Sequence, residues 1–431
     1  MEYLPVLVLV LSFVTLLAIG TPVAWSISIA SVLTMMVSIP TVAALTTVSQ
    51  RMATGLDSFA LLAIPFFVLS GQLMNKGGIA HRLIAFAKTL VGAMPGGLAL
   101  INIISAMLMG AIAGSAMASA SAMGSILGPE MEKEGYSKEF GAAVNVTSAT
   151  TGLVIPPSNV LIVYSLASGG VSIAALFLAG YLPGMLTGLL LMAVAYFWAK
   201  KKGFRVGERS SLGEVARTFV AAFPSLMLLV VVMGGIVVGV FTATEASAIA
   251  VLYTLVLGVA YREINWKNLP EILLEASATT AIVMLLIGAS MSMSWVMSYE
   301  NIPQGISTAL LGLSENPIVI LLIINLLLLV VGTFMDMTPA VLIFTPIFLP
   351  IVTALGMDPV HFGIVMVLNL CIGLCTPPVG SVLFVGVGIA GTTIEKVIKP
   401  LLPLFAAMLL ALFLVTYFPG LSLWLPKLFG M

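Results

Sequence analysis

Long runs of apolar residues, separated by short polar segments, dominate the chain. Eight runs are long enough to cross a lipid bilayer as helices, because about twenty apolar residues span its hydrocarbon core. They lie near 4–19, 21–38, 59–75, 171–199, 221–240, 243–261, 277–298 and 399–418. The pattern therefore predicts a bundle of membrane-spanning helices.

Four further stretches are apolar but interrupted by small residues or prolines, and they cover 98–133, 138–168, 317–355 and 360–390. Short amphipathic pieces lie between the spans, such as Ile79–Val91 and Trp266–Glu275. Their charges lie on one helical face, which is typical of helices in the membrane interface. Ordinary polar loops are the alternative interpretation of these pieces.

Composition narrows the class of protein. Of the 431 residues, 60% are hydrophobic and 8% are charged, and seventeen Lys and Arg balance seventeen Asp and Glu. Soluble domains carry roughly 25% charged residues, and nucleic-acid binding needs a basic face. Soluble, disordered and nucleic-acid-binding proteins are therefore excluded, which leaves an all-α polytopic membrane protein.

Candidate catalytic and metal-binding side chains are few. The two cysteines, Cys371 and Cys375, lie four residues apart in one apolar segment, so neither a disulfide framework nor a zinc spacing exists. The two histidines, His81 and His361, each lie beside a segment end, and no HExxH motif occurs. The two cysteines are interpreted as small buried residues that fill space. Because no catalytic cluster is present in the sequence, the chain is not expected to be an enzyme.

The chain contains an internal repeat. GLVIPP at 152–157 returns as GLCTPP at 373–378, which is 221 residues later. The same spacing relates Pro129 to Pro350, Gly135 to Gly356 and Gly170 to Gly391. A repeat of this kind predicts two homologous halves, 1–205 and 215–431, joined by a polar cytoplasmic linker at 206–214.

Charge placement predicts how the two halves are oriented. If each half has five spans plus one re-entrant hairpin, all Lys and Arg except Arg51 and Lys427 fall on the cytoplasmic side. Positive-inside insertion produces this bias. Because five is odd, the second half is expected to be inverted, with both termini outside the cytoplasm. Inverted repeats are typical of secondary transporters, which bind substrate near the bilayer midplane.

One interrupted element in each half is predicted to be a re-entrant hairpin. The segment 98–133 carries small residues at Gly114–Ser119, suited to a tight turn between two arms of about half a bilayer each. It is expected to enter from the cytoplasm. Its counterpart, 317–355, has GTFMDMTP at its tip and is expected to enter from outside. Ordinary spans, kinked by glycine and packed through small residues, are the alternative.

The other interrupted element is a helix broken by two prolines. Pro156 and Pro157 lack N–H groups, so the carbonyls of Gly152 and Leu153 are expected to lack helical partners. Pro377 and Pro378 have the same effect in the second half. Unpaired carbonyls deep in a membrane are unfavourable, so a bound cation is the predicted partner. The half-helix after each break presents free N–H groups that suit an anion.

The embedded segments 98–129, 140–168, 317–355 and 360–390 contain no Lys or Arg. A carboxylate substrate there would be neutralised by helix N-termini and co-bound cations, which favours sodium coupling. Proton coupling would need an embedded acid, and the candidates are Asp57, Glu245 and Asp336. Asp57 is expected to be solvated, and Glu245 to cap a helix. Asp336 either lines the site or makes a local turn bond.

Seven segments of the chain carry recognisable motifs: LLAIPFFVLSGQLMNKGGI at 61–79, GSAMASASAMG at 114–124, IPPSN at 155–159, SIAALFLAGYLPG at 172–184, FTATEASA at 241–248, VGTFMDMTPAVLIFTPIFLP at 331–350 and DPVHFGIVMVLNLCIGLCTPPVG at 358–380. By these motifs the chain resembles, over nearly its full length, the large membrane subunit (DctM type) of tripartite ATP-independent periplasmic (TRAP) transporters. One departure is FTATEA, where the family usually has FTPTEA.

The resemblance implies an elevator-type, sodium-driven importer of organic acids in the bacterial inner membrane. It also implies two partners, a small four-helix Q subunit on a separate polypeptide and a periplasmic substrate-binding protein, P. A stand-alone sodium/carboxylate symporter is the alternative, and a membrane enzyme or structural subunit is a third interpretation.

The family's ion sites lie about the hairpin tips and the broken helices. Candidate sodium ligands at these places are Gly114, Thr150, Gly152, Pro156, Pro157, Gly332, Asp336, Gly373, Thr376, Pro377 and Pro378. Candidate substrate ligands are Ser115, Ser119, Ser158, Asn159, Thr338 and Gly380. The anion is expected between the two tips and the two broken helices.

Overall fold

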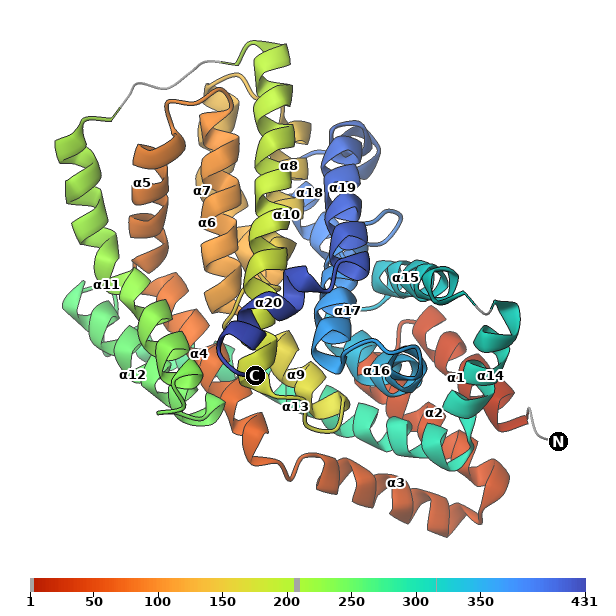
Figure 1. Cartoon of the computed structure of the whole chain (residues 1–431). Coiled ribbons are helices and arrows are strands. Elements are labelled where there is room, and N and C mark those ends of the chain that lie inside the picture. Colours follow the sequence, from red (N-terminus) through yellow and green to blue (C-terminus); the bar gives the residue numbers. More distant parts are fainter. Residues whose placement is uncertain (1–3, 205–209, 315) are drawn as a thin grey trace.

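The structure is a computed structural model that describes residues 4–204, 210–314 and 316–431, and every regular element in these ranges is a helix (Figure 1). Up to the central linker the elements are α1 (Leu4–Ala18), α2 (Val23–Ser38), α3 (Thr41–Gly55), the 3-10 helix η1 (Phe59–Leu62), α4 (Ala63–Lys76), α5 (Ile79–Val91), α6 (Gly97–Ala113), α7 (Ala116–Lys133), α8 (Lys138–Thr151), α9 (Asn159–Ala167) and α10 (Ile173–Lys202).

The remaining elements follow the linker, of which residues 206–209 lie outside the described ranges. They are α11 (Leu212–Val237), α12 (Ala243–Ala260), α13 (Leu269–Tyr299), α14 (Ile302–Leu313), α15 (Pro317–Phe334), α16 (Met337–Ala354), α17 (Pro359–Gly373), α18 (Ser381–Ala390), α19 (Ile394–Tyr417) and α20 (Gly420–Leu428).

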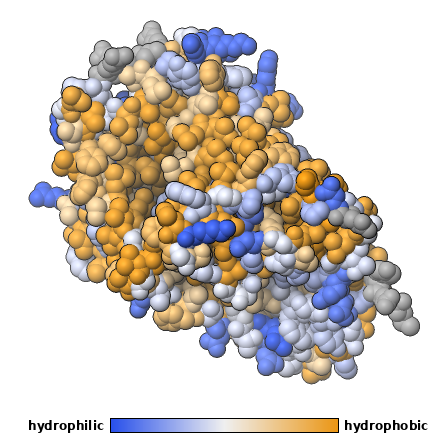
Figure 2. All heavy atoms as spheres, viewed as in Figure 1, coloured by the Kyte–Doolittle hydropathy of each residue, from blue (hydrophilic) through white to orange (hydrophobic). Residues whose placement is uncertain are grey.

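Eight helical segments in the described ranges are long and apolar enough to cross a membrane, and six of them correspond to predicted spans. The other two are α15 and α16, whereas α1 and α2, predicted as spans, are shorter apolar helices. Apolar side chains form a broad surface on the face that Figure 2 shows, and hydrophilic residues are scattered along its edges and in a small cluster near its centre. An apolar surface of this size is unfavourable in water and favourable against lipid. The prediction of an all-α polytopic membrane protein is confirmed.

The interrupted segments break where the sequence indicates. The first hairpin is α6 and α7, with its turn at Gly114 and Ser115, and the second is α15 and α16, with its turn at Met335 and Asp336. The broken helices are α8 with α9, and α17 with α18. The hairpin arms are longer than expected. At 1.5 Å per residue, arms of 17 and 18 residues reach about 26 Å, which approaches the hydrocarbon thickness.

The short helices between the spans agree only in part with the sequence-based expectation. Ile79–Val91 forms helix α5 as expected. Trp266–Glu275 is not a separate helix, because α13 begins at Leu269 and continues through the apolar run to Tyr299. Helix α3, at the lower edge of Figure 1, forms from a mixed polar and apolar sequence that contains no long apolar run. It packs against α13 and α2, so its stability comes from tertiary contacts.

Helix boundaries in the two halves follow the spacing of 221 residues. The bounds of α7, 116 and 133, correspond to those of α16, 337 and 354. The beginnings of α8 and α10 correspond in the same way to those of α17 and α19. Thr150 and Cys371, also 221 residues apart, touch at the centre, where the Cys371 thiol donates to the Thr150 carbonyl at 3.1 Å.

The helices pack in two groups that meet around the hairpins. Helix α1 packs on α2, helices α2 and α3 pack on each other and on α13, and α11 packs on α12. Helix α4 contacts both α12 and α13 and so joins these two sets. Helices α10 and α19 pack instead on the broken helices α8 and α17 and on each other. Contacts of α13 with α16, and of α4 with α6 and α9, connect the groups. The helices of the apolar runs 171–199 and 399–418 therefore pack mainly with the broken helices rather than with α1–α3 or α11–α13.

Candidate functional site

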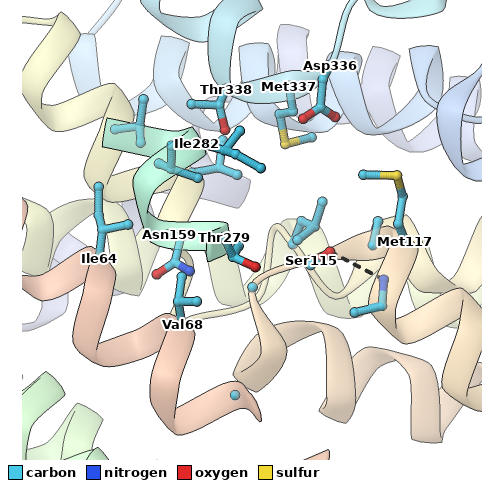
Figure 3. Close-up of a pocket in the computed structure, with 18 of the residues that line it drawn as sticks. Ile64, Val68, Ser115, Met117, Asn159, Thr279, Ile282, Asp336, Met337 and Thr338 are labelled. Atoms are coloured by element: carbon cyan, nitrogen blue, oxygen red, sulfur yellow. Dashed lines mark hydrogen bonds between the residues drawn. The ribbon is translucent and has the colours of Figure 1, made fainter. Parts of the chain in front are cut away.

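A cavity of about 370 Å³ lies where the two hairpin tips approach each other. Figure 3 shows Asp336, Met337 and Thr338 on one side, facing Ser115, Asn159 and Thr279 on the other. The breaks contribute Leu153, Val160 and Leu374. Both tips, both broken helices and helices α4 and α13 therefore line one cavity. The cavity lies between the tips and the breaks, where the sequence predicts the substrate.

The first tip is shaped by a glycine and a helix cap. Gly114 has φ of 62°, a left-handed conformation that other residues rarely adopt, and a Cβ there would collide with the Asn159 amide. Ser115 then caps α7, accepting a hydrogen bond from Ala118 N at 3.3 Å. The Asn159 side-chain oxygen is buried and has no partner among the described residues. An oxygen of this kind is suited to a bound cation or a hydroxyl donor.

The second tip presents the only charged side chain among the described residues that line the cavity. Asp336 immediately precedes α16, is exposed to the cavity, and makes no capping hydrogen bond to that helix. Asp336 therefore lies in the cavity lining, which is one of the two positions that the sequence left open. By contrast, Glu245 forms a capping box with Thr242, as expected.

Sequence reasoning missed a polar contribution from the outer helices. Gln72 and Asn75 on α4 and Thr279 on α13 also line the cavity. The Asn75 side-chain oxygen is buried and, like that of Asn159, has no partner in the described ranges. The polar sequence SGQLMNK inside an otherwise apolar span was a signal that could have identified Gln72 and Asn75. Thr279 carried no comparable signal.

The four carbonyls at the breaks lack their i+4 helical donors, as expected, but the prediction that a bound cation must satisfy them is wrong, because each has another protein donor. After each break the chain turns so that nearby donors reach back to the freed oxygens. The partners are Ile155 N for Gly152 O at 3.2 Å, the Ser158 hydroxyl for Leu153 O at 2.6 Å, Thr376 N for Gly373 O at 2.9 Å, and Leu383 N for Leu374 O at 3.4 Å. Unpaired carbonyls therefore give no reason to place a cation within the breaks.

The candidate ligands divide into two sets by position. Gly114, Ser115, Asn159, Asp336 and Thr338 line the cavity. The others lie outside its lining: Ser119, Thr150, Gly152, Pro156, Pro157, Ser158, Gly332, Gly373, Thr376, Pro377, Pro378 and Gly380.

Several residues of the second set have structural partners. The Ser119 hydroxyl donates to Ala106 O at 3.4 Å, and the Thr376 hydroxyl donates to Ile372 O at 2.7 Å. Gly380 N donates to Thr333 O at 3.0 Å, which connects the second break to the neighbouring hairpin. These hydroxyl and amide groups therefore have protein partners of their own, and the Gly380–Thr333 contact joins the second break to a hairpin.

Substitution of Ser158 by alanine is expected to destabilise the first break. Ser158 is 1% exposed, and its hydroxyl donates a hydrogen bond to Leu153 O at 2.6 Å. A buried carbonyl left without a donor is unfavourable by about 1–3 kcal/mol. We expect a lower thermal unfolding midpoint for Ser158→Ala in detergent. Ser28→Ala is the matched control, because Ala24 O keeps its helical N–H partner, and equal effects of the two changes would contradict the prediction.

These features define the class of protein, a polytopic helical transporter with two hairpins and two broken helices around one cavity. Residues 10–421 match the family described as "Tripartite ATP-independent periplasmic transporter, DctM component". The chain belongs to this family, and it is the large permease component of a TRAP transporter.

Individual relatives agree with this assignment. The chain is 57% identical to the uncharacterized protein YgiK of Salmonella typhimurium, covering 100% of this chain and 99% of that protein. It is 40% identical to the sialic acid TRAP transporter large permease SiaM of Vibrio cholerae, covering 88% and 89% of the two chains. Other relatives are named as TRAP permeases for isethionate, C4-dicarboxylate and 2,3-diketo-L-gulonate.

A solved structure shares the fold. The YdaH transporter of Alcanivorax borkumensis matches with a TM-score of 0.63 at 15% identity, over 87% of this chain and 88% of that one. Its title describes an unusual topology. At this identity the likeness supports the architecture alone, and the relatives named as permeases imply a transport role rather than an enzymatic one.

Proposed function

We propose that the chain is the permease of a sodium-coupled importer that moves an organic acid across the bacterial inner membrane. The observation that carries this proposal is the composition of the cavity wall. It contains no Lys or Arg among the described lining residues, yet it contains the carboxylate of Asp336. A carboxylate substrate that binds in this cavity would be repelled by the charge of Asp336 unless a cation accompanied it.

The sodium ions bind on the cavity wall in this proposal, rather than inside the proline breaks. Asp336 supplies negative charge, and the amide oxygens of Asn159 and Asn75 are buried without partners among the described residues. Ser115 and Thr338 supply hydroxyl groups on the two tips. Carboxylate, amide and hydroxyl oxygens are the ligands that hard cations prefer.

The substrate is an organic acid anion delivered by a periplasmic binding protein. Relatives are named for sialic acid, isethionate, C4-dicarboxylate and 2,3-diketo-L-gulonate, which differ in size and in their other groups but are all acids. A permease cavity shared across such relatives recognises the acid group, while the binding protein selects the compound. A thermal-shift ligand screen on the cognate binding protein would identify the acid carried.

The second protein partner in this proposal is a small Q-type membrane subunit. The isethionate relative is named DctMQ, and the present chain covers 65% of its length. The additional length of that relative fits a fused Q subunit, which we propose to be a separate polypeptide here. In the proposed topology both termini are periplasmic, and the two halves are inverted repeats.

Transport proceeds by an elevator movement in this proposal. Sodium first orders the two hairpin tips around the anion. The hairpins and broken helices then move together with α10 and α19, which pack on them, against α1–α3 and α11–α13. Inward release of sodium removes the countercharge and frees the acid. Gln72, Asn75 and Thr279 lie on the stationary side, so they contact the substrate at one end of the movement.

Reconstitution in vesicles tests the proposal. With the Q subunit, the binding protein and an inward sodium gradient, we expect uptake of the labelled acid, and loss of uptake when potassium replaces sodium. Uptake that persists without a sodium gradient would overturn sodium coupling. Uptake without the binding protein would favour the stand-alone symporter, and absence of any flux in the full assembly would exclude both transport mechanisms.

A further inference from the structure

A second large cavity, of about 870 Å³, opens between the C-terminal end of α10 and the N-terminal end of α19. These ends lie at the top of Figure 1, away from the hairpin tips. Four lysines line it, Lys201 and Lys202 from α10 and Lys396 and Lys399 from α19, and all four are exposed. We call this feature the lysine groove. It shares no lining residue with the cavity between the hairpin tips.

The positive charge of the groove is not neutralised by the described side chains. Two carboxylates, Glu139 and Glu395, also line it, which leaves an excess of two positive charges. Within residues 4–204, 210–314 and 316–431, no carboxylate oxygen lies within 4.0 Å of the four ammonium groups. Glu139 instead accepts a hydrogen bond from Thr392 at 3.3 Å. The groove is therefore complementary to an anion.

One wall of the groove is aromatic and held in place by stacking. Trp198 stacks on Phe140, with ring centroids 5.6 Å apart and planes at 7°. Phe204 packs against Tyr136 at 4.2 Å. Trp198 and Phe204 line the groove, so its ligand meets apolar surface as well as cationic groups. A small hydrated anion has no use for such a wall, whereas the glycerol and acyl portions of a lipid do.

The length of α10 indicates the depth at which the groove lies. The helix has 30 residues and is about 45 Å long, whereas the hydrocarbon core is about 30 Å thick. Its last turn, which contains Lys200, Lys201 and Lys202, therefore extends into the headgroup layer. Trp198 lies one turn earlier, at the depth where tryptophan is enriched in membrane proteins.

We propose that the lysine groove binds the phosphate headgroup of an anionic membrane phospholipid. The ammonium groups of α10 and α19 contact the phosphate from two sides, and the aromatic wall contacts the glycerol and the first acyl carbons. Basic pockets between membrane helices on the cytoplasmic side bind anionic headgroups in this way. The bound lipid would join α10 to α19, the two long helices that pack on the broken helices.

Thermal unfolding of the delipidated full chain in detergent tests the proposal. We expect phosphatidylglycerol to raise the unfolding midpoint of the wild type by several degrees, and phosphatidylcholine to have little effect. In Lys396→Gln/Lys399→Gln the increase should fall to less than half. Lys396→Arg/Lys399→Arg should retain it, because arginine preserves the charge. Native mass spectrometry should show correspondingly fewer retained phosphatidylglycerol molecules in the glutamine variant.

The control variant is Arg217→Gln/Lys267→Gln, which removes two exposed cations outside the groove. It is expected to keep the full increase of the unfolding midpoint with phosphatidylglycerol. An equal loss in this control would overturn the proposal, because the lysines would then act only through overall charge. An undiminished response in Lys396→Gln/Lys399→Gln would overturn it too. Stabilisation by soluble glycerol phosphate equal to that by phosphatidylglycerol would replace the lipid with a water-soluble phosphate.

Discussion

Substitution of Gly373 by alanine is expected to abolish most transport and to lower the thermal stability of the protein. Gly373 ends α17 at the second break, where it meets Gly332 of the neighbouring hairpin arm α15. A Cβ on Gly373 would lie 2.6 Å from the Gly332 Cα and carbonyl carbon. Both contacts are with backbone, so no side-chain rotation can relieve them, and α17 must move away from α15.

The first half contains the same arrangement, which extends the prediction. A Cβ on Gly152 would lie 2.6 Å from the Gly110 Cα and 2.9 Å from Ala106 O. Overpacking in a close-packed interior is unfavourable by about 1–3 kcal/mol even when side chains can adjust. Displacing a broken helix would also displace the cavity wall that follows it. We expect uptake by Gly373→Ala and Gly152→Ala to fall at least tenfold.

Two glycines serve as matched controls for these variants. A Cβ on Gly388 of α18 or on Gly128 of α7 would meet no atom within 4 Å. Because alanine favours helix more than glycine does, Gly388→Ala and Gly128→Ala should be as stable as the wild type or slightly more stable. Midpoints of thermal unfolding and initial uptake rates, measured together, check the prediction. Wild-type values for Gly373→Ala would show that the break tolerates separation from the hairpin.

Hydropathy and breaker residues predicted the fold well, because the membrane imposes both signals. Every long apolar run became a helix, since a backbone in hydrocarbon must satisfy its own hydrogen bonds. The turns at Gly114 and Asp336 were also predicted, because local sequence determines where a helix can begin. Helix α3 was missed because its position depends on packing against α13 rather than on its own composition.

The candidate site was predicted less completely, for a different physical reason. The positions of the two tips follow from local sequence, and both line the cavity. Thr279 joins them through the packing of α13, which no local pattern encodes, whereas the polar residues inside the apolar span of α4 could have indicated Gln72 and Asn75. The carbonyl prediction failed because it counted only helical donors. The Ser158 hydroxyl reaches Leu153 O five residues away, a contact that depends on the path of the turn.

Substitution of Asp336 by asparagine is expected to raise the sodium concentration that gives half-maximal uptake by at least tenfold. The change preserves the shape of the side chain and removes the only negative charge among the described cavity-lining residues. A tenfold weaker association corresponds to about 1.4 kcal/mol. A carboxylate paired with a cation in a partly desolvated cavity can readily contribute this much. Sodium titrations of uptake at a fixed concentration of loaded binding protein measure the effect.

The matched control for Asp336 is Asp57, an exposed carboxylate between α3 and η1 that does not line the cavity. Asp57→Asn removes the same charge from the protein, so it separates a local effect of Asp336 from a change in overall electrostatics. Asp57→Asn should leave the sodium titration unchanged, while Asp336→Asn should shift it without lowering the thermal unfolding midpoint. An unshifted titration for Asp336→Asn would place the sodium ions away from the second tip. The cation would then have to balance the substrate charge from the first tip, through the oxygens of Ser115 and Asn159.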